Sequence, residues 1–399
     1  MPTDFGKIAI VGAGIGGLAA ALALIRRGID VEVYEQAHEL REFGAGVQVS
    51  ANGTRILHAL GLKSALEQVE VLPAGKVVRL WDTGQSFKQF DLGMESVERY
   101  GSPYITIHRG DLHTVIAEAL TREKPGAIHL RHKLARLSQD GEGVQLEFEA
   151  AAPARAGLVI GADGVHSAVR ANLIGDARPQ FCGIVAWRGV VPVESLPASI
   201  ATTVGTQWVG PGGHVVHYPL RHGREFNIVN VYRTADHAER LDATAARSEL
   251  NHAYRDTHPA ARELVGMMDL RWRRSIGDRD PVRHWHKGRI VLLGDAAHAP
   301  LQTLAQGASM AIEDGFCLGE LIHAGDGDFS AAFRRFEMVR LPRTARVQIE
   351  SRRLWDQLYH LDEGIERDVR NVMVADWDEA YLFQCLAWLY DGAAVPGSN

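Results

Sequence analysis

The stretch IAIVGAGIGG, residues 8–17, decides the fold of this chain. Its apolar first half has the pattern of a short buried strand, and the glycines lead through a tight turn into a helix rich in alanine and leucine. Gly12 and Gly14 lack a Cβ where the chain turns and where a pyrophosphate approaches, while Gly17 lets the helix lie close to the strand. The helix N-terminus offers free N–H groups and a partial positive charge to phosphates. The stretch therefore predicts a site for a dinucleotide.

An acidic residue supports this prediction. A second strand pattern, residues 30–34, ends directly before Glu35. A carboxylate at that place accepts hydrogen bonds from both ribose hydroxyls of an adenosine and repels a 2′-phosphate. Strand, turn, helix, strand and acid in this order favour a dinucleotide site over a chance glycine turn.

Length and composition exclude several classes of protein. A chain of 399 residues is long for one hydrophobic core, which favours two domains. The net charge of −6 argues against a nucleic-acid partner, and no apolar run is long enough for a membrane span. Because the first strand begins within a few residues of Met1, we expect no signal peptide. Cys182, Cys317 and Cys385 form no CxxC pair, which predicts a reducing, cytoplasmic location and buried, inert thiols.

The chain alternates between two kinds of pattern, which predicts a mixed α/β fold with a discontinuous domain organisation. The βαβ pattern of a Rossmann-like cofactor domain occupies residues 1–75, 100–176 and 276–345. Short segments rich in β-branched and aromatic residues, typical of an antiparallel substrate-domain sheet, occupy residues 76–99 and 177–275. Residues 346–399 form a C-terminal helical region whose aromatic cluster is interpreted as a core flap, a subunit contact or a hydrophobic ligand site.

Several individual elements follow from local patterns. We expect a hairpin between residues 76–81 and 86–90, and helices over residues 244–257, 307–324 and 329–358.

Two further motifs place acids at strand ends. Ile160-Gly-Ala-Asp163-Gly ends one apolar strand, and Gly294-Asp295 ends another. Open α/β sheets bind ligands at the carboxyl ends of their strands. Asp295 can accept a hydrogen bond from a ribitol hydroxyl, and the helix that opens at Gly307 and Ala308 has a dipole suited to a flavin oxygen that becomes negative on reduction.

At this point the chain resembles the single-component flavin-dependent aromatic hydroxylases. The resemblance spans nearly the whole chain and covers the glycine turn, the two acidic motifs and the stretch from Tyr104 to His113. It implies bound FAD, NADH as a transient electron donor, and a position beside the flavin for Arg109. The alternative interpretation of Arg109 is an arginine that is solvated or paired in the core. The resemblance also implies that Asp163 helps to bind both cofactors.

Within the family the chain is most similar to the 3-hydroxybenzoate 6-hydroxylases, through residues 208–221, 294–302 and 354–362. This similarity implies that Tyr104, His214, Tyr218 and Gln302 contact the substrate, with His214, Gln302 and Tyr218 in the chemistry. Residues 214, 216 and 218 of a strand share one face, which supports the assignment; His217 faces the other way. The alternative is that His214 is an ordinary sheet residue.

The resulting hypothesis is hydroxylation of 3-hydroxybenzoate to 2,5-dihydroxybenzoate (gentisate) through a flavin C4a-hydroperoxide, in a homodimer that uses molecular oxygen and no bound metal. Three alternatives remain open. The first is salicylate or a hydroxypyridine carboxylate as the substrate. The second is an FAD oxidase or dehydrogenase, and the third is a flavin-binding protein without turnover.

Overall fold

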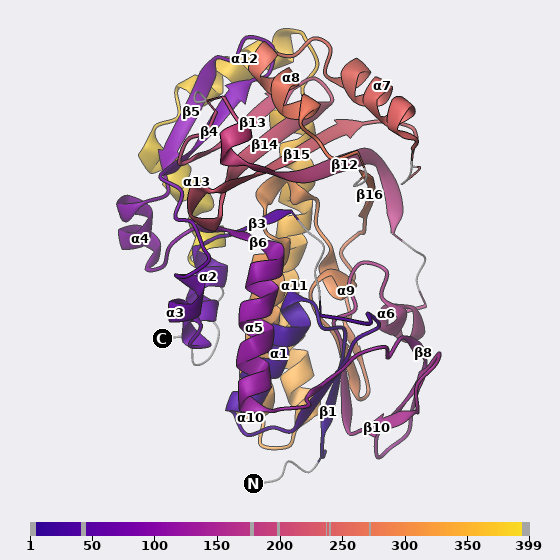
Figure 1. The fold of residues 1–399 in the computed structure, drawn as a ribbon. Helices are drawn as coiled ribbons and strands as arrows, with labels where there is room; N and C mark the ends of the chain where they lie inside the picture. Colours follow the sequence, from indigo (N-terminus) through magenta and orange to yellow (C-terminus); the bar gives the residue numbers. More distant parts are fainter. Residues whose placement is uncertain are drawn as a thin grey trace.

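The computed structural model describes residues 5–40, 45–175, 179–197, 200–236, 238, 241–270 and 273–392. It contains two large sheets at opposite ends of the molecule, with long helices between and around them (Figure 1). The mixed α/β fold is confirmed. The predicted domain boundaries stay a prediction, and residues 393–399 of the predicted C-terminal region lie outside the described residues.

The first sheet contains the glycine turn. Its strands follow one another in the order β17 (His286–Lys287), β18 (Ile290–Leu292), β11 (Leu158–Gly161), β1 (Ile8–Val11), β2 (Val31–Tyr34) and β7 (Ile128–His129). All neighbours are parallel except β17 and β18. Every residue of β1 and β11 is buried, as expected for central parallel strands covered on both faces. The sheet therefore brings the ends of β1, β2 and β11 to one edge.

Three long helices pack beside this sheet. They are α1 (Ile15–Arg26), α5 (Arg109–Glu123) and α10 (Gly307–Ala324), and Figure 1 shows them side by side. The crossing of α1 and α10 is very close, because small residues face each other there: a Cβ on Gly315 would lie 2.6 Å from the backbone nitrogen of Ala20. The 25-residue helix α11 (Phe329–Arg353) packs against α10.

The second sheet is mostly antiparallel, as predicted. Its order is β16 (Arg273–Asp278), β12 (Gln180–Pro192), β15 (Glu225–Arg233), β14 (Gly213–Leu220), β13 (Val204–Gly210), β4 (Gly75–Leu80) and β5 (Ser86–Asp91). The predicted hairpin is β4 and β5, and β4 joins the sheet through parallel pairing with β13. The outer face is covered by α7 (Ala243–Ala253) and α8 (Pro259–Gly266), whose apolar residues share a core with Val185, Val215 and Ile228 (Figure 1).

Smaller elements complete the fold. Two small sheets comprise β8 (Leu134–Gln139), β9 (Val144–Phe148) and β10 (Ala154–Ala156), and β3 (Gly46–Val49) with β6 (Ile105–His108). The remaining helices are α2 (Ala51–Ala59), α3 (Lys63–Leu66), α4 (Met94–Tyr100), α6 (Ala168–Leu173), α9 (Asp295–His298), α12 (Ile365–Ala375) and α13 (Glu379–Tyr390), with a π-helical segment at Leu354–Tyr359.

The aromatic C-terminal segment is a packed flap. Phe383 and Tyr390 of α13 are buried in a cluster with Tyr100, whose hydroxyl donates to the Phe383 carbonyl at 2.6 Å. Tyr381, on the same helix, is 44% exposed. Of the three interpretations, burial in a core flap therefore describes Phe383 and Tyr390.

Three local expectations need correction. The helix expected over residues 244–257 ends at Ala253, because Tyr254 leaves the helical region as the C-cap (φ −115°, ψ 18°), and α8 begins at Pro259. The helix expected over residues 329–358 continues as an α-helix only to Arg353 and then widens into the π-helical segment. The three thiols are not all buried: Cys317 is, Cys182 is partly exposed, and Cys385 lies on an exposed face of α13.

The close helix crossing predicts a large effect of one methyl group. Gly315→Ala places a Cβ against the backbone of α1, which cannot move aside like a flexible side chain. We expect the helices to separate and the free energy of unfolding to fall by about 1–3 kcal/mol, measured by urea denaturation. The matched control is Gly266→Ala, at an exposed position at the end of α8, where the new Cβ meets nothing within 4 Å; its stability should stay the same or rise. Equal stability of the two variants would contradict this packing constraint.

Candidate active site

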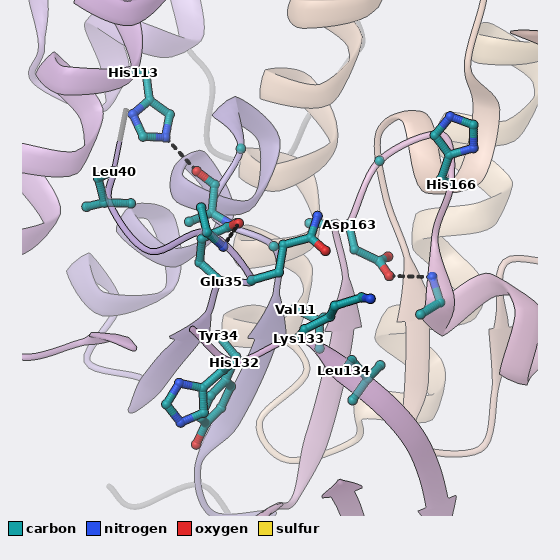
Figure 2. Close-up of a pocket in the computed structure, with 18 of the residues that line it drawn as sticks. Val11, Tyr34, Glu35, Leu40, His113, His132, Lys133, Leu134, Asp163 and His166 are labelled. Carbon is teal, nitrogen blue, oxygen red and sulfur yellow. Dashed lines mark hydrogen bonds between the residues drawn. The ribbon is translucent and has the colours of Figure 1, made fainter. Parts of the chain in front are cut away.

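A cavity of about 700 Å³ opens where β1, β2 and β11 end (Figure 2). Five of the residues predicted to bind the cofactor line it: Gly12, Gly14, Glu35, Arg109 and Asp163. Sequence reasoning missed several other lining residues, among them Tyr34, His113, His132, Lys133 and His166. The glycine turn, Glu35 and Asp163 therefore meet at one cavity, whereas Asp295 lines a second one.

The glycine turn has the geometry that its sequence predicts. Gly12 adopts a φ of +102°, and a Cβ there would lie 2.5 Å from the Ala162 carbonyl oxygen. A Cβ on Gly17 would lie 2.1 Å from the Gly12 carbonyl oxygen, so Gly17 serves helix packing and does not line the cavity. Gly14 precedes the first residue of α1, and a Cβ there would meet nothing within 4 Å.

The first turn of α1 carries no acidic residue, so its positive end faces the cavity uncompensated. His113 supports the turn from α5, because its Nε2 lies 2.7 Å from the Ala13 carbonyl, which can only accept (Figure 2). This combination of bare backbone, free N–H groups and helix dipole suits a pyrophosphate.

The two acids of this cavity are held by backbone donors. The Glu35 carboxylate accepts hydrogen bonds from the Ala13 and Ala37 amides at 2.8 and 2.9 Å. Asp163 accepts from the amide of Ala168 at 2.7 Å, the bond drawn in Figure 2, and from the amide of Val169 at 3.1 Å, both at the start of α6. Burial raises the pKa of Asp163, although these hydrogen bonds oppose the shift. Each carboxylate is oriented by the turn beside it before a ligand adds further contacts.

A second cavity, of about 210 Å³, lies between the inner face of the seven-stranded sheet and the start of α10. The predicted residues His214, Tyr218, Gln302, Asp295, Gly307 and Ala308 all line it. Val216 lies between His214 and Tyr218 on the same strand and also lines the cavity, while His217 does not. The strand alternation therefore gives the correct face for each residue of β14.

Tyr104 is the predicted substrate residue that does not line this cavity. It is buried behind it, and its hydroxyl donates to Oε1 of Gln48, which does line the cavity. A direct contact between Tyr104 and a substrate stays a prediction; the observed contact is indirect, through Gln48.

A hydrogen-bonded pair fixes the state of His214. His214 Nδ1 lies 2.8 Å from His360 Nε2, and His360 Nδ1 lies 2.9 Å from the Trp355 carbonyl. Burial lowers the pKa of His214 to about 3 and that of His360 to about 2, so both rings are neutral at pH 7. Since the carbonyl only accepts, His360 carries its proton on Nδ1 and accepts at Nε2. His214 must then donate from Nδ1, which leaves its Nε2 as a hydrogen-bond acceptor.

Sequence reasoning assigned no role to His360 or to Arg188. His360 lies in the segment 354–362 that carries the family resemblance, but the π-helical geometry that aims it at His214 has no sequence signature. Arg188 of β12 lines the second cavity, and its Nη2 donates to Gln302 Oε1 at 2.9 Å. The sequence signal that could have indicated Arg188 is a charged residue within an otherwise apolar strand pattern.

Comparison with known proteins identifies the family. A family model described as an FAD binding domain matches residues 6–328. This chain belongs to that FAD-binding family. The 3-amino-4-hydroxybenzoate 2-monooxygenase of Streptomyces platensis is 38% identical over 98% of this chain and 97% of that protein. The 3-hydroxybenzoate 6-hydroxylase of Polaromonas naphthalenivorans is 36% identical over 98% of this chain and 96% of that protein.

A solved structure agrees with this assignment. Klebsiella pneumoniae HpxO complexed with FAD and uric acid superposes with a TM-score of 0.85 at 27% identity, covering 96% of this chain and 97% of that chain. The protein is thus an FAD-dependent monooxygenase with the fold of the single-component aromatic hydroxylases. Among the described residues, no helix combines the length and apolar character needed to cross a bilayer. The described ranges also hold no group of three or more His, Cys, Asp or Glu side chains arranged for a metal ion.

The open space beside Gly14 predicts a variant that folds but does not hold FAD. Gly14→Val adds a side chain that meets no protein atom at its Cβ but enters the space that a pyrophosphate needs. We expect a folded, colourless protein, measured by circular dichroism and by the flavin absorbance of the purified sample. Gly141→Val, in an exposed loop where the new Cβ also meets nothing, should stay yellow. Full flavin content in Gly14→Val would place the pyrophosphate elsewhere.

Buried neutral histidines predict a pH-dependent stability. Burial, with a smaller contribution from the charge of Arg79, lowers the pKa of His217 to about 3, against about 6.5 in the unfolded chain. Between these values the unfolded chain binds more protons, so the free energy of unfolding falls as the pH falls. At pH 5 this one residue costs about 2 kcal/mol relative to neutral pH.

His217→Leu removes that titration without touching the second cavity. We expect the loss of stability between pH 7.5 and pH 5, measured from urea unfolding curves, to be smaller in the variant than in the wild type. An identical pH dependence of the two proteins would show that His217 is already protonated in the folded state.

Proposed function

We propose that this protein hydroxylates 3-hydroxybenzoate to 2,5-dihydroxybenzoate, with FAD as the bound cofactor, NADH as the electron donor and molecular oxygen as the co-substrate. The observation that carries the proposal is His214, a neutral imidazole on the wall of the second cavity whose Nε2 is an acceptor. The similarity to 3-hydroxybenzoate 6-hydroxylases supports this choice of substrate.

FAD would span both cavities in this proposal. Gly12, Gly14, Glu35, Arg109 and Asp163 would hold its adenosine and pyrophosphate end in the first cavity. Asp295, Gly307 and Ala308 would hold the ribitol and the ring system in the second, where the start of α10 favours negative charge. When bound, the reduced flavin supplies the activated oxygen, and the protein supplies position and electrostatics.

His214 would act on the phenol. A phenol has a pKa near 10, so at neutral pH its ring is a weak nucleophile until its proton is shared. A histidine with a pKa of about 3 cannot hold that proton in the ground state. Its Nε2 instead accepts a hydrogen bond from the hydroxyl, and the proton moves toward it only as electron density leaves the oxygen for the ring. Tyr218 and Gln302 would position the same ring from either side.

Three further parts of the proposal have separate support. NADH as the donor follows from the family resemblance. A cytoplasmic location follows from the cysteines, which form no CxxC pair. A homodimer would cover the apolar face of α12, where Ile365, Val369 and Val372 are between 50 and 76% exposed. Sedimentation of the purified holoenzyme as a monomer at micromolar concentration would contradict the dimer.

The substrate is tested with a panel of aromatic acids. NADH consumption, product identity and hydrogen peroxide are measured with 3-hydroxybenzoate, salicylate, 3-amino-4-hydroxybenzoate and 6-hydroxynicotinate. We expect 3-hydroxybenzoate to give gentisate with little peroxide. If another acid of the panel is the one hydroxylated, that acid is the substrate and the reaction class is unchanged. Peroxide without hydroxylated product from all four acids would contradict hydroxylation and favour an oxidase.

Replacement of His214 should separate hydroxylation from flavin binding. We expect His214→Ala to retain FAD and to be reduced by NADH. Its rate of product formation should fall by about 10²-fold or more, because the group that shares the phenolic proton is lost. The product formed per NADH consumed should fall and the released peroxide should rise. Both are measured by chromatography and a peroxide assay on the folded variant.

His217→Ala is the matched control, since the same side chain is removed from the same strand on the opposite face. It should lower stability and leave the product per NADH unchanged. If His214→Ala and His217→Ala behaved alike, His214 would be only a packed residue of the sheet.

A further inference from the structure

We propose that Arg188 and Gln302 form a carboxylate-binding subsite in the second cavity, which restricts the substrates to aromatic acids in their anionic form. The inference rests on the proposed function in one respect, namely that the second cavity holds the aromatic substrate. It assigns the carboxylate to Arg188 and Gln302, and not to Tyr218, which lines the same cavity.

The first observation is the isolation of the Arg188 charge. Among the described residues, no carboxylate lies within ion-pair distance of the Arg188 guanidinium. Its hydrogen bond in the cavity goes to the neutral amide of Gln302. Desolvation lowers the pKa of Arg188, and the charges of Arg109 and Arg274 act in the same direction, while Tyr218 and Asp295 oppose the shift. A buried cation without a carboxylate in ion-pair contact favours an anionic ligand.

The second observation is a pair of unpartnered donors. Arg188 Nε and Gln302 Nε2 are buried, and each lacks a hydrogen-bond partner among the described residues. Because a guanidinium has only donors, the Gln302 amide must turn its oxygen to Arg188 Nη2, which leaves its NH₂ group facing away. Two N–H donors on side chains that line one cavity lack acceptors, and a carboxylate supplies two oxygens.

The third observation is the place of Arg188 on the sheet. Arg188 pairs across the sheet with Val229, and Val229 pairs with Val216, so these three form one row. His214 and Tyr218 lie one row above and below on β14. A flat ring over Val216 and Val229 therefore meets His214 at one corner and Arg188 at another. This arrangement suits a ring with a hydroxyl and a carboxylate on different carbons.

The test compares acids with their neutral amides. Holoenzyme is titrated with 3-hydroxybenzoate and 3-hydroxybenzamide, and with salicylate and salicylamide, while the flavin absorbance reports binding. We expect the wild type to bind at least one acid about 10- to 100-fold more tightly than its amide, the range that a charged hydrogen bond contributes. Arg188→Met should lose that preference, and Arg188→Lys should keep part of it.

Arg79→Met is the matched control, because Arg79 belongs to the same sheet but lies over the ring of Trp208 and does not line the cavity. It should retain the full preference for the acid. Arg188→Met should also unfold at an unchanged or higher temperature, since no ion pair is broken; a structural arginine would instead lower the unfolding temperature.

Three binding results would overturn the subsite: equal binding of acid and amide by the wild type, a retained preference in Arg188→Met, or a lost preference in Arg79→Met. Loss of FAD from Arg188→Met would also overturn it, because the arginine would then belong to the cofactor site. Failure of the proposed function looks different. An acid that binds with an Arg188-dependent preference but is never hydroxylated contradicts the function and supports the subsite.

Discussion

The close crossing of α1 and α10 is the constraint on which both cavities depend. Glycine and alanine face each other across the crossing, so that a Cβ on Gly16 would lie 2.9 Å from Ala311 Cβ and one on Gly319 would lie 2.9 Å from Ala23 Cβ. The N-terminus of α1 opens on the first cavity and that of α10 on the second. Because no side chain separates the helices, their positive ends stay at a set spacing, which suits a cofactor with a pyrophosphate at one end and a redox ring at the other.

A buried ionic cluster holds the second of these helix starts in place. Asp314 of α10 accepts hydrogen bonds from the Gly294 amide at 2.9 Å and from Arg340 Nε at 2.7 Å, and it contacts His298 Nε2. The positive charges around it, with the Gly294 hydrogen bond, lower its pKa despite the cost of burial. One carboxylate thereby joins α9, α10 and α11. Asp295 follows Gly294 directly, so its backbone position depends on this cluster although its own side chain is exposed.

The parts of the site that sequence predicts are those whose signal is local. The turn at Gly12 and Gly14, and the faces of His214 and His217, follow from spacing along one segment. Arg188 and His360 do not, because their roles depend on pairing between β12, β15 and β14, and on a π-helical segment after α11. Nothing in the neighbourhood of residue 188 indicates which strand will lie two places away in the sheet. The same limit explains Tyr104: its motif was visible, but its burial behind Gln48 depends on tertiary contacts.

His214, which is proposed to act on the substrate, and His217 differ in their contacts although their surroundings are similar. They lie on the same strand, both are almost fully buried, and burial lowers the pKa of both to about 3. Neither burial nor pKa therefore distinguishes the two residues. The difference is in the hydrogen bonds: both ring nitrogens of His217 lack partners among the described residues, whereas His214 lines a cavity and donates to His360, which leaves Nε2 as its acceptor. In the proposed function the fixed tautomer makes Nε2 of His214 the atom that shares the phenolic proton, whereas no partner fixes the tautomer of His217.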